Sequence, residues 1–282
     1  MSKYRITVDT GGTFTDVVYF REDTREISIH KLPSTPHDPS LAIVAGVRHL
    51  LDQGVAAEDV EYFCHGTTVG TNALLEGKGA KTGLLVTEGF RGIYEVAEQS
   101  TPHGPSVFDV TYQKPSLLAP ESMTGEVIER VDFQGKVLKK LDEAALRKTV
   151  QEFRKKGVQS VAVCLLFSFL YPRHEKRIAE IFEKEAPEIS ISLSSEILPQ
   201  IREFFRLSTT VTNAYLQLIL ERYVHHLETQ LDDAGLHTKK RYIMQSNGGT
   251  ATFDAAARKA VATVLSGPAG GVTAGVNLAR DV

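Results

Sequence analysis

The segment between Val8 and Val18 combines residue types that can hold phosphate. An apolar β-type run meets Gly11 and Gly12, after which a second apolar run begins, so the chain is predicted to turn back as a hairpin at the two glycines. Glycines let the backbone bring its N–H groups close to an anion, and threonines add hydroxyl donors. The predicted phosphate contacts are Gly11, Gly12, Thr13 and Thr15.

Two aspartates flank the same turn. Asp9 ends the first run and Asp16 lies within the second, and carboxylates of this kind hold a metal ion or its bound waters. A dinucleotide fingerprint is excluded because it needs a third glycine and a following helix, and a P-loop is excluded because it needs Gly-Lys-Ser/Thr. An ordinary hairpin, in which Asp9 forms an Asx turn, stays open as the alternative.

A second polar segment, His65-Gly66-Thr67-Thr68, is predicted to lie where a strand passes into a helix. Amides and hydroxyls at a helix start form a pocket for an anion or a carboxylate, and Asn72 would lie about one helical turn from Thr68. The alternative is that Thr67 or Thr68 caps the helix while His65 is a core histidine with its hydrogen bonds satisfied.

Two glycine-rich segments lie further along the chain. Gln245 to Gly249 is predicted to be a loop after a short strand. Ser266 to Gly271 combines a serine, a proline and glycines, which suits an anion at a helix start. Close helix packing that demands small residues would explain the same composition.

These segments need strands and helices to position them, and the hydrophobic pattern alternates in the way typical of an α/β domain. Strands are predicted over residues 4–9, 13–20, 26–32, 60–64, 84–87, 158–167, 189–193 and 242–244, with a hairpin over 126–141. Helices are predicted over 38–54, 67–77, 142–157 and 205–233, and from Pro172 and Ser266 onward. The proline-containing stretch over 101–122 is predicted to be a loop or lid.

Composition narrows the class of protein. The chain has 282 residues, 42% of them hydrophobic, so it can bury the core of one large or two smaller soluble domains. Its net charge of -3 and mixed charges argue against a nucleic-acid or membrane partner. The N-terminus lacks the apolar core of a signal peptide, so the cytoplasm is predicted. Cys64 and Cys164 lie far apart, which argues against a disulfide or a zinc site.

Several separated motifs occur in one order along almost the whole chain, and together they resemble the A-type subunits of the hydantoinase/oxoprolinase family. The motifs are Asp9-Thr10-Gly11-Gly12-Thr13-Phe14-Thr15-Asp16, His65-Gly66-Thr67-Thr68, Thr71-Asn72-Ala73-Leu74-Leu75-Glu76, Thr210 with Asn213-Ala214-Tyr215, Gln245-Ser246-Asn247-Gly248-Gly249, and Ser266-Gly267-Pro268-Ala269-Gly270-Gly271-Val272. An ordered set of this kind is more specific than any single glycine-rich loop.

The resemblance implies an α/β fold, namely an actin-like ATPase domain of the ribonuclease H type with an inserted α/β subdomain. Such folds split the ATP site between two related domains, and the family carries a second Asp-Gly-Gly-Thr loop. One such loop is present here, so we expect the N-terminal portion of an A-type subunit with the second ATPase half missing. The expected regions are 1–100 (phosphate binding), 101–122 (loop or lid), 123–200 (α/β subdomain) and 201–282 (long helix, cleft loop and start of the second half).

The resemblance also implies an activity: the opening of a cyclic amide, such as a hydantoin or 5-oxoproline, driven by ATP and Mg²⁺. It implies catalytic roles for Asp9 and His65 and metal binding by Asp9 and Asp16. The implied cofactor contacts are Gly11, Gly12, Thr13, Thr15, Ser266, Gly267, Gly270 and Gly271, and the implied substrate contacts are Thr67, Thr68, Asn72, Asn247 and Gly248. The implied partner is a B-type subunit or the rest of the A-type subunit, in an oligomer.

Three alternatives stay open at this point. Acetone and acetophenone carboxylases are similar and activate ketones by the same logic, so ketone activation is the first alternative. A non-catalytic half-ATPase that serves as an assembly partner is the second. A sugar kinase is the third, although that fold would explain neither the His-Gly-Thr-Thr nor the Gln-Ser-Asn-Gly-Gly segment.

Overall fold

The computed structural model describes residues 3–35, 37–97, 111 and 115–280, and these form two compact units. Unit 1 comprises residues 1–78 and 219–282, and unit 2 comprises residues 79–218. Unit 2 is therefore an insertion within unit 1. The predicted division at residues 100, 122 and 200 differs from this one, because the strand over 82–87 belongs to the inserted unit. The predicted loop or lid lies largely outside the described residues.

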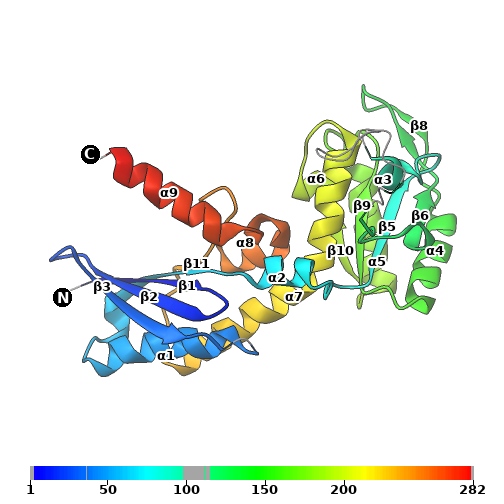
Figure 1. Ribbon diagram of the computed structural model, residues 1–282. Coiled ribbons are helices and arrows are strands. Elements are labelled where there is room, and N and C mark those ends of the chain that lie inside the picture. Colours follow the sequence, from blue (N-terminus) through cyan, green and yellow to red (C-terminus); the bar gives the residue numbers. More distant parts are fainter. Residues whose placement is uncertain (1–2, 36, 98–110, 112–114, 281–282) are drawn as a thin grey trace. The chain divides into compact units, whose positions relative to one another are not determined.

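Unit 1 is built on a six-stranded sheet in the order β12-β11-β4-β1-β2-β3 (Figure 1). The strands are β1 (Tyr4–Thr10), β2 (Phe14–Arg21), β3 (Glu26–Pro33), β4 (Val60–Gly66), β11 (Arg241–Met244) and β12 (Thr250–Thr252). β1 pairs in parallel with β4, and β4 pairs in parallel with β11. The carboxyl ends of these three strands therefore meet at one edge of the sheet.

Strand alternation gives the β1–β2 hairpin a buried face and an open face. Val8, Val17 and Tyr19 are buried and pack toward α1 (Pro39–Asp52), where the Tyr19 hydroxyl donates to the Gly46 carbonyl at 2.7 Å. The side chain of Asp38 accepts from the Ser40 N–H at 3.1 Å and caps α1 as predicted. Asp9 lies on the opposite face, because successive residues of a strand point to opposite sides.

Unit 1 contains further helices. They are η1 (Ala57–Asp59), α2 (Val69–Leu75), α8 (Phe253–Arg258), η3 (Ala260–Thr263), α9 (Ser266–Arg280) and the second part of α7 (Glu203–Asp233). Of these, α8 and α9 contact the parallel part of the sheet. α9 contacts β4 and β11 and begins beside Asp9 on the open face of the sheet. β12 and α8 were not predicted; each is short, and a short run carries little periodicity.

Unit 2 contains a four-stranded parallel sheet in the order β10-β9-β5-β6. Its strands are β5 (Thr82–Thr87), β6 (Thr124–Val127), β9 (Ser160–Cys164) and β10 (Ser190–Leu193). Its helices are α3 (Ile93–Val96), η2 (Glu121–Met123), α4 (Glu143–Lys155), α5 (Arg173–Glu185), α6 (Ser194–Ile197) and the first part of α7. One apolar core joins Leu85, Phe153, Val163 and Phe182. The α/β class is confirmed in both units.

Two predicted elements of unit 2 are shorter than expected. The hairpin predicted over 126–141 is limited to β7 (Arg130–Val131) and β8 (Val137–Lys139), because β6 joins the parallel sheet instead. The apolar run over 158–167 forms a strand only as far as Cys164. Phe167 beyond it has a positive φ of 57°, which no strand residue adopts. No helix in the described part of the chain is long and apolar enough to cross a membrane.

Candidate functional site

The glycine bend between β1 and β2 presents unused backbone N–H groups. The Gly11 N–H donates to the Phe14 carbonyl at 3.0 Å and closes the turn. Ser34, directly after β3, supports it, because its hydroxyl donates to the Gly11 carbonyl at 2.8 Å and its N–H donates to the Thr13 carbonyl at 2.9 Å. Among the described residues no hydrogen bond is formed by the N–H groups of Gly12 or Thr13, both exposed. The bend can therefore donate to an anion.

Two segments, β4 and the start of α9, approach the carboxylate of Asp9. Asp9 pairs with Gly66 in the parallel register of β1 and β4, and a Cβ atom placed on Gly66 would lie 3.0 Å from Asp9 Oδ1. A Cβ atom placed on Gly267, at the start of α9, would lie 3.9 Å from the same oxygen. Glycine at position 66 therefore leaves the space that the carboxylate fills. Gly66 was missed as a site residue, although the register of two parallel strands could have indicated it.

The start of α9 is held in this position by the segment after β4. The Ser266 hydroxyl donates to the Thr67 carbonyl at 3.1 Å, and the Leu265 N–H donates to the Thr71 hydroxyl at 3.0 Å. Ser266 is fully buried and is the first residue of the 15-residue helix. The positive end of the helix dipole therefore lies beside Asp9 and the glycine bend, where it favours negative charge.

Asp9 is an exposed residue, yet its carboxylate is under modest electrostatic strain. Burial and the neighbouring carboxylate of Asp16 both raise its pKa, and burial is the larger cause. Asp16 instead forms an ion pair with Lys31, at 2.9 and 3.2 Å. Among the described residues no basic side chain forms an ion pair with Asp9. A cation bound at Asp9 would relieve this strain.

The donor set fits Mg²⁺ that arrives together with phosphate. No group of three or more His, Cys, Asp or Glu side chains that could hold a metal occurs in the described part of the chain. Mg²⁺ commonly binds to only one or two carboxylates and completes its shell with phosphate oxygens and waters. Asp9 would be such a ligand. Asp16 faces the same side of the sheet but is already paired with Lys31.

Thr15 lies on the other face of the hairpin. It is fully buried, and its hydroxyl lies 3.0 Å from the Ser34 hydroxyl. It therefore holds the bend from the core side, and the geometry does not favour the phosphate contact that the sequence suggested. The alternation of Thr15, Val17 and Tyr19 as one buried face is a sequence signal that could have indicated this.

His65 is a fully buried core residue. Its Nε2 lies 2.7 Å from the Tyr223 hydroxyl and its Nδ1 lies 3.4 Å from the Val8 carbonyl. Burial lowers the pKa of His65 to about 4, so the ring is neutral at pH 7. Both nitrogens are occupied inside the protein, so the geometry favours a structural role, and the catalytic role stays a prediction without geometric support.

The residues after His65 form the first turn of α2. The Thr67 hydroxyl accepts from the Val69 N–H at 3.2 Å, which makes it a local cap. Asn72 lies one turn from Thr68 as expected, because its Nδ2 donates to the Thr68 hydroxyl at 3.3 Å. Asn72 is exposed and Thr68 is half-buried. These two side chains, unlike Thr67, are accessible to a ligand.

The loop after β11 packs against α9. Asn247 Oδ1 accepts from the Gly249 N–H at 2.9 Å, so the Asn247 side chain shapes its own turn. Gly248 has a φ of 80°, and a Cβ atom there would collide with the Thr273 hydroxyl. Gly270 faces Met244 of β11, whereas Gly271 has no neighbour at its Cβ position. Gly248 therefore serves the close approach of the loop to α9. Gly270 packs against β11 at an ordinary distance, in line with the packing alternative recognised for the segment from Ser266 to Gly271.

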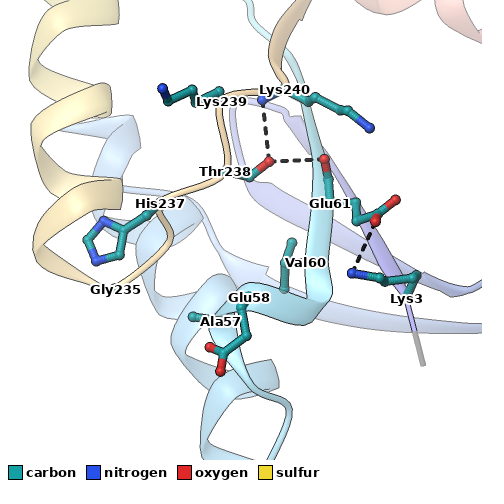
Figure 2. A pocket seen from close by; sticks show the side chains of 10 residues that line it. All are labelled: Lys3, Ala57, Glu58, Val60, Glu61, Gly235, His237, Thr238, Lys239 and Lys240. Carbon is teal, nitrogen blue, oxygen red and sulfur yellow. Dashed lines mark hydrogen bonds and ion pairs between the residues drawn. The ribbon is translucent and has the colours of Figure 1, made fainter. Parts of the chain in front are cut away.

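Surface hollows of unit 1 lie away from this cluster. One of about 450 Å³ is lined by the amino ends of β4 and β11, including Val60, Glu61 and Lys240 (Figure 2). Its polar groups largely satisfy one another, since Lys3 pairs with Glu61 at 3.1 Å and the Thr238 hydroxyl donates to the Glu61 carbonyl at 3.0 Å. The cluster around Asp9 lies at the carboxyl ends of the same strands, which is the edge that binds ligands in α/β folds.

Comparisons with known protein families cover most of the chain. Residues 5–186 match the model described as "Hydantoinase/oxoprolinase N-terminal region", and residues 206–281 match the model described as "Hydantoinase/oxoprolinase". Every residue of the cluster around Asp9 lies within these two ranges.

Similar proteins are longer than this chain. Caprolactamase subunit alpha of Pseudomonas jessenii is 36% identical over 99% of this chain and 41% of its own length. The 5-oxoprolinase 1 of Arabidopsis thaliana is 34% identical over 96% of this chain and 23% of its own length. The acetophenone carboxylase gamma subunit of Aromatoleum aromaticum is 31% identical over 95% of this chain and 38% of its own length. The chain thus spans about two fifths or less of these relatives.

A solved structure shares the fold. The crystal structure of the ATP-dependent caprolactamase from Pseudomonas jessenii matches with a TM-score of 0.87 and 35% identity, covering 99% of this chain and 40% of that one. The match extends over both units of the chain.

Proposed function

The chain belongs to the hydantoinase/oxoprolinase family, and on that premise we propose that it forms the phosphate-binding part of an ATP-dependent enzyme that opens cyclic amides. The observation that carries the proposal is the approach of Gly66 and Gly267 to the carboxylate of Asp9, beside the glycine bend. The names of the similar caprolactamase and 5-oxoprolinase support a cyclic amide as the substrate class.

The chemistry explains why ATP would be needed. Amide resonance makes a ring carbonyl a poor electrophile, and transfer of a phosphoryl group to its oxygen creates a group that water can displace. Phosphoryl transfer depends mainly on positioning and on neutralising charge around the phosphate oxygens. A site for it therefore needs N–H donors, a metal-binding carboxylate and little else.

Each requirement has a candidate in unit 1. The N–H groups of Gly12 and Thr13 would donate to phosphate oxygens, and the start of α9 at Ser266 and Gly267 would add its dipole. Asp9 would hold Mg²⁺ or one of its waters, and Mg²⁺ when bound would supply the positive charge that bridges phosphate oxygens. Thr68, Asn72 and the loop at Asn247 are the proposed substrate contacts.

The wider setting is also a proposal. Two of the similar proteins are named as subunits, an alpha subunit of caprolactamase and a gamma subunit of acetophenone carboxylase. We accordingly propose that this chain works in an oligomer with a B-type partner subunit or with further A-type sequence. A cytoplasmic location is proposed on the sequence composition.

The decisive experiment is calorimetric titration of the chain with Mg²⁺-ATP. We expect micromolar binding for the unmodified chain and loss of detectable binding for Asp9→Asn, since the substitution removes the charge that would hold the metal. Asp52→Asn is the matched control, because Asp52 is exposed at the end of α1 on the opposite face of the sheet. Unchanged binding in Asp9→Asn would remove Asp9 from the site.

The same titration addresses the non-catalytic alternative. A half-ATPase that serves only in assembly would not bind Mg²⁺-ATP. If the unmodified chain gave no heat of binding with Mg²⁺-ATP, that alternative would be favoured. Ketone activation remains a second candidate, favoured by the 31% identity to the acetophenone carboxylase gamma subunit. Comparing ATP cleavage by the complete enzyme with a lactam and with a ketone would separate the two chemistries.

A further inference from the structure

A second group of polar side chains lies at the carboxyl edge of the unit 2 sheet. Thr87 is the last residue of β5, Glu129 follows β6, and Leu166 follows β9. These strands are neighbours and parallel, so their ends lie together. Open α/β sheets bind ligands at this edge. None of these residues takes part in the phosphate site proposed for unit 1.

Glu129 is a buried carboxylate with both oxygens engaged. Its side chain is 1% exposed. The Thr87 hydroxyl donates to Oε1 at 2.6 Å and itself accepts from the Leu166 N–H at 3.1 Å. The second oxygen, Oε2, lies 2.7 Å from Nδ1 of His174, the second residue of α5. A buried charge of this kind is tolerated only with such partners.

The contact with Glu129 orients the His174 ring. An ionised carboxylate only accepts hydrogen bonds, so with Glu129 in that form Nδ1 is the donor. In the neutral ring Nε2 then carries the lone pair. Nε2 forms no hydrogen bond within the described part of the chain, and the side chain is 13% exposed. This is the arrangement of a histidine that a carboxylate orients for acid–base work.

The loop that leads to His174 adds a second observation. Phe167, between β9 and α5, adopts a φ of 57°, a conformation that costs an ordinary residue on the order of 1–3 kcal/mol and is concentrated at functional sites. The loop is nevertheless ordered by hydrogen bonds from the Leu170 and Tyr171 N–H groups to the Phe167 carbonyl, at 3.1 and 2.9 Å. The guanidinium of Arg206 lies 5.1 Å from the Phe169 ring.

We propose that Nε2 of His174, in a ring held by Glu129 and Thr87, binds a small neutral N–H donor at the carboxyl edge of the unit 2 sheet. Nε2 accepts the hydrogen bond of the donor, and no covalent bond is made or broken in this binding. His174 is the group that touches the ligand, whereas Glu129 and Thr87 are positioning residues.

A metal at this position is disfavoured. His174 and Glu129 do not belong to any set of three potential ligands within the described residues, and the carboxylate is occupied by Thr87 and His174 rather than open to an ion. A neutral ligand suits the position better, since Glu129 already provides the balancing charge. The choice of a lactam as the probe rests on the proposed function, whereas the binding position itself does not.

The first test is carbethoxylation of the whole unmodified chain with diethyl pyrocarbonate, mapped by mass spectrometry. The reagent adds to an accessible unprotonated ring nitrogen and releases ethanol and carbon dioxide. His65, fully buried with both nitrogens occupied, is the internal negative control, and the exposed His226 is the positive control. We expect reaction at His174, slowed about tenfold by 2-pyrrolidinone at ten times its Kd, with no slowing at His226.

The second test is calorimetric titration with 2-pyrrolidinone. We expect the heat of binding to be lost in His174→Gln and kept in His226→Gln and in Asp9→Asn. Asp9→Asn separates this inference from the phosphate site, because Asp9 belongs to that site and not to the group around His174. If the chain failed to bind Mg²⁺-ATP, the titration with 2-pyrrolidinone would still test His174. The inference is overturned if His174 is as unreactive as His65, or if 2-pyrrolidinone neither protects His174 nor binds.

Discussion

At the scale of single residues, Asp9 is the proposed metal ligand and carries a cost in stability. Its carboxylate is partly withdrawn from water and repelled by Asp16, so its pKa is raised. A raised pKa means that the folded state holds the ionised form less well than the unfolded state does. A bound cation would reverse this preference. Residues that serve a ligand rather than the fold commonly carry such a cost.

The Asp9→Asn variant should therefore be more stable than the unmodified chain, although it should no longer bind nucleotide. The amide keeps the shape of the side chain but removes the desolvated charge, so we expect a higher thermal midpoint than that of the unmodified chain at pH 7. Thermal unfolding without nucleotide measures the effect, with Asp52→Asn as the control that should not change. A lower midpoint in Asp9→Asn would mean that the carboxylate contributes to the fold.

His65 makes the stability of unit 1 depend on pH. Its pKa is lowered from 6.5 to about 4 by burial, so between these values the unfolded chain binds a proton that the folded chain excludes. Stability is therefore lost as the pH falls through this window, by about 2 kcal/mol between pH 7 and pH 5. Urea unfolding at the two pH values measures the loss.

The variant His65→Gln identifies the source of this pH dependence. Glutamine does not titrate, so the variant should lose most of the difference between pH 7 and pH 5, whatever its stability at pH 7. His226→Gln, which changes an exposed histidine, should keep the difference. If both variants behave like the unmodified chain, another group is responsible.

At the scale of elements, close packing matters more than the visible ion pairs. Gly79 precedes β5, and a Cβ atom on it would collide with the Tyr215 ring of α7. Tyr215 is buried and its carbonyl accepts from the Ala80 N–H at 2.9 Å, so the ring has little room to move. Only glycine fits between these two segments of unit 2.

Gly79→Ala should accordingly destabilise the chain by roughly 1–3 kcal/mol, the usual cost of forcing extra atoms into a packed region. Gly92→Ala is the matched control, because nothing lies within 4 Å of its Cβ position and its φ is negative. Chemical unfolding of both variants measures the difference. Equal stability would show that Tyr215 can move aside.

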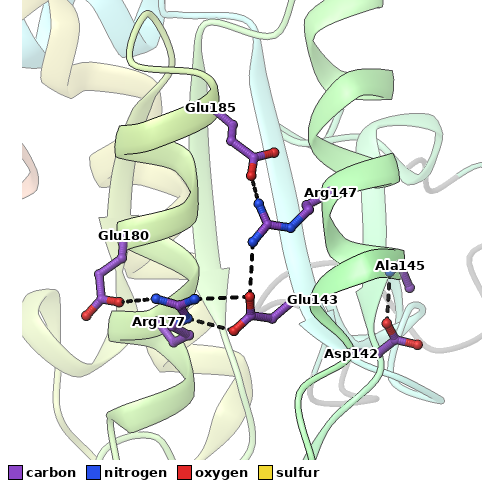
Figure 3. A network of polar contacts seen from close by, with 7 residues as sticks. All are labelled: Asp142, Glu143, Ala145, Arg147, Arg177, Glu180 and Glu185. Carbon is purple, nitrogen blue, oxygen red and sulfur yellow. Dashed lines mark hydrogen bonds and ion pairs between the residues drawn. The ribbon is translucent and has the colours of Figure 1, made fainter.

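The charged network between α4 and α5 is conspicuous but exposed (Figure 3). Glu143 accepts from Nε and Nη2 of Arg177 at 2.7 and 3.0 Å, and from Nη2 of Arg147 at 3.1 Å. The hydrogen bond from Arg177 is the largest cause that lowers the pKa of Glu143. Exposed pairs of this kind stabilise proteins only slightly, because water and salt screen them.

We expect Glu143→Gln to lower the thermal midpoint slightly at low salt and hardly at all at high salt. Glu152→Gln on the same helix is the control, since Glu152 is exposed and takes part in no ion pair among the described residues. Thermal unfolding at two salt concentrations measures both. A large loss that salt does not reduce would assign the network a structural role beyond charge pairing.

At the scale of the whole molecule, the chain consists of one discontinuous unit and one continuous unit. Unit 2 runs without a break from residue 79 to 218 and has its own apolar core. Its four-stranded sheet is complete within that range, since each strand pairs only with its neighbours among the four. Unit 1 requires residues from both ends of the chain. The inserted unit should therefore be the part that can fold alone.

A fragment of residues 79–218 should unfold cooperatively with heat, and a fragment of residues 123–200 should not. The shorter fragment lacks β5, which lies between β9 and β6 and pairs with both. Circular dichroism and amide proton spectra of the two fragments check the prediction. A cooperative transition in the shorter fragment would show that the sheet does not depend on β5.

Local patterns in the sequence predicted most elements of the fold. Periodicity located β1, β2, α1 and nearly all of α7, and the Asp38 cap and the glycine bend were correct. The order of the motifs identified the family. Such features are local, because each depends on the spacing of residues within one element and on the chemistry of its ends.

The tertiary structure decided which of the marked residues lie near Asp9 and which lie in the core. It brought Gly66 and Gly267 to Asp9, placed Thr15 and His65 in the core, and gave Gly248 and Gly270 to helix packing. The physical reason is that a strand has two faces and a polar residue can serve either of them. Which face is buried depends on the helices that pack there, and those contacts join residues far apart in the sequence.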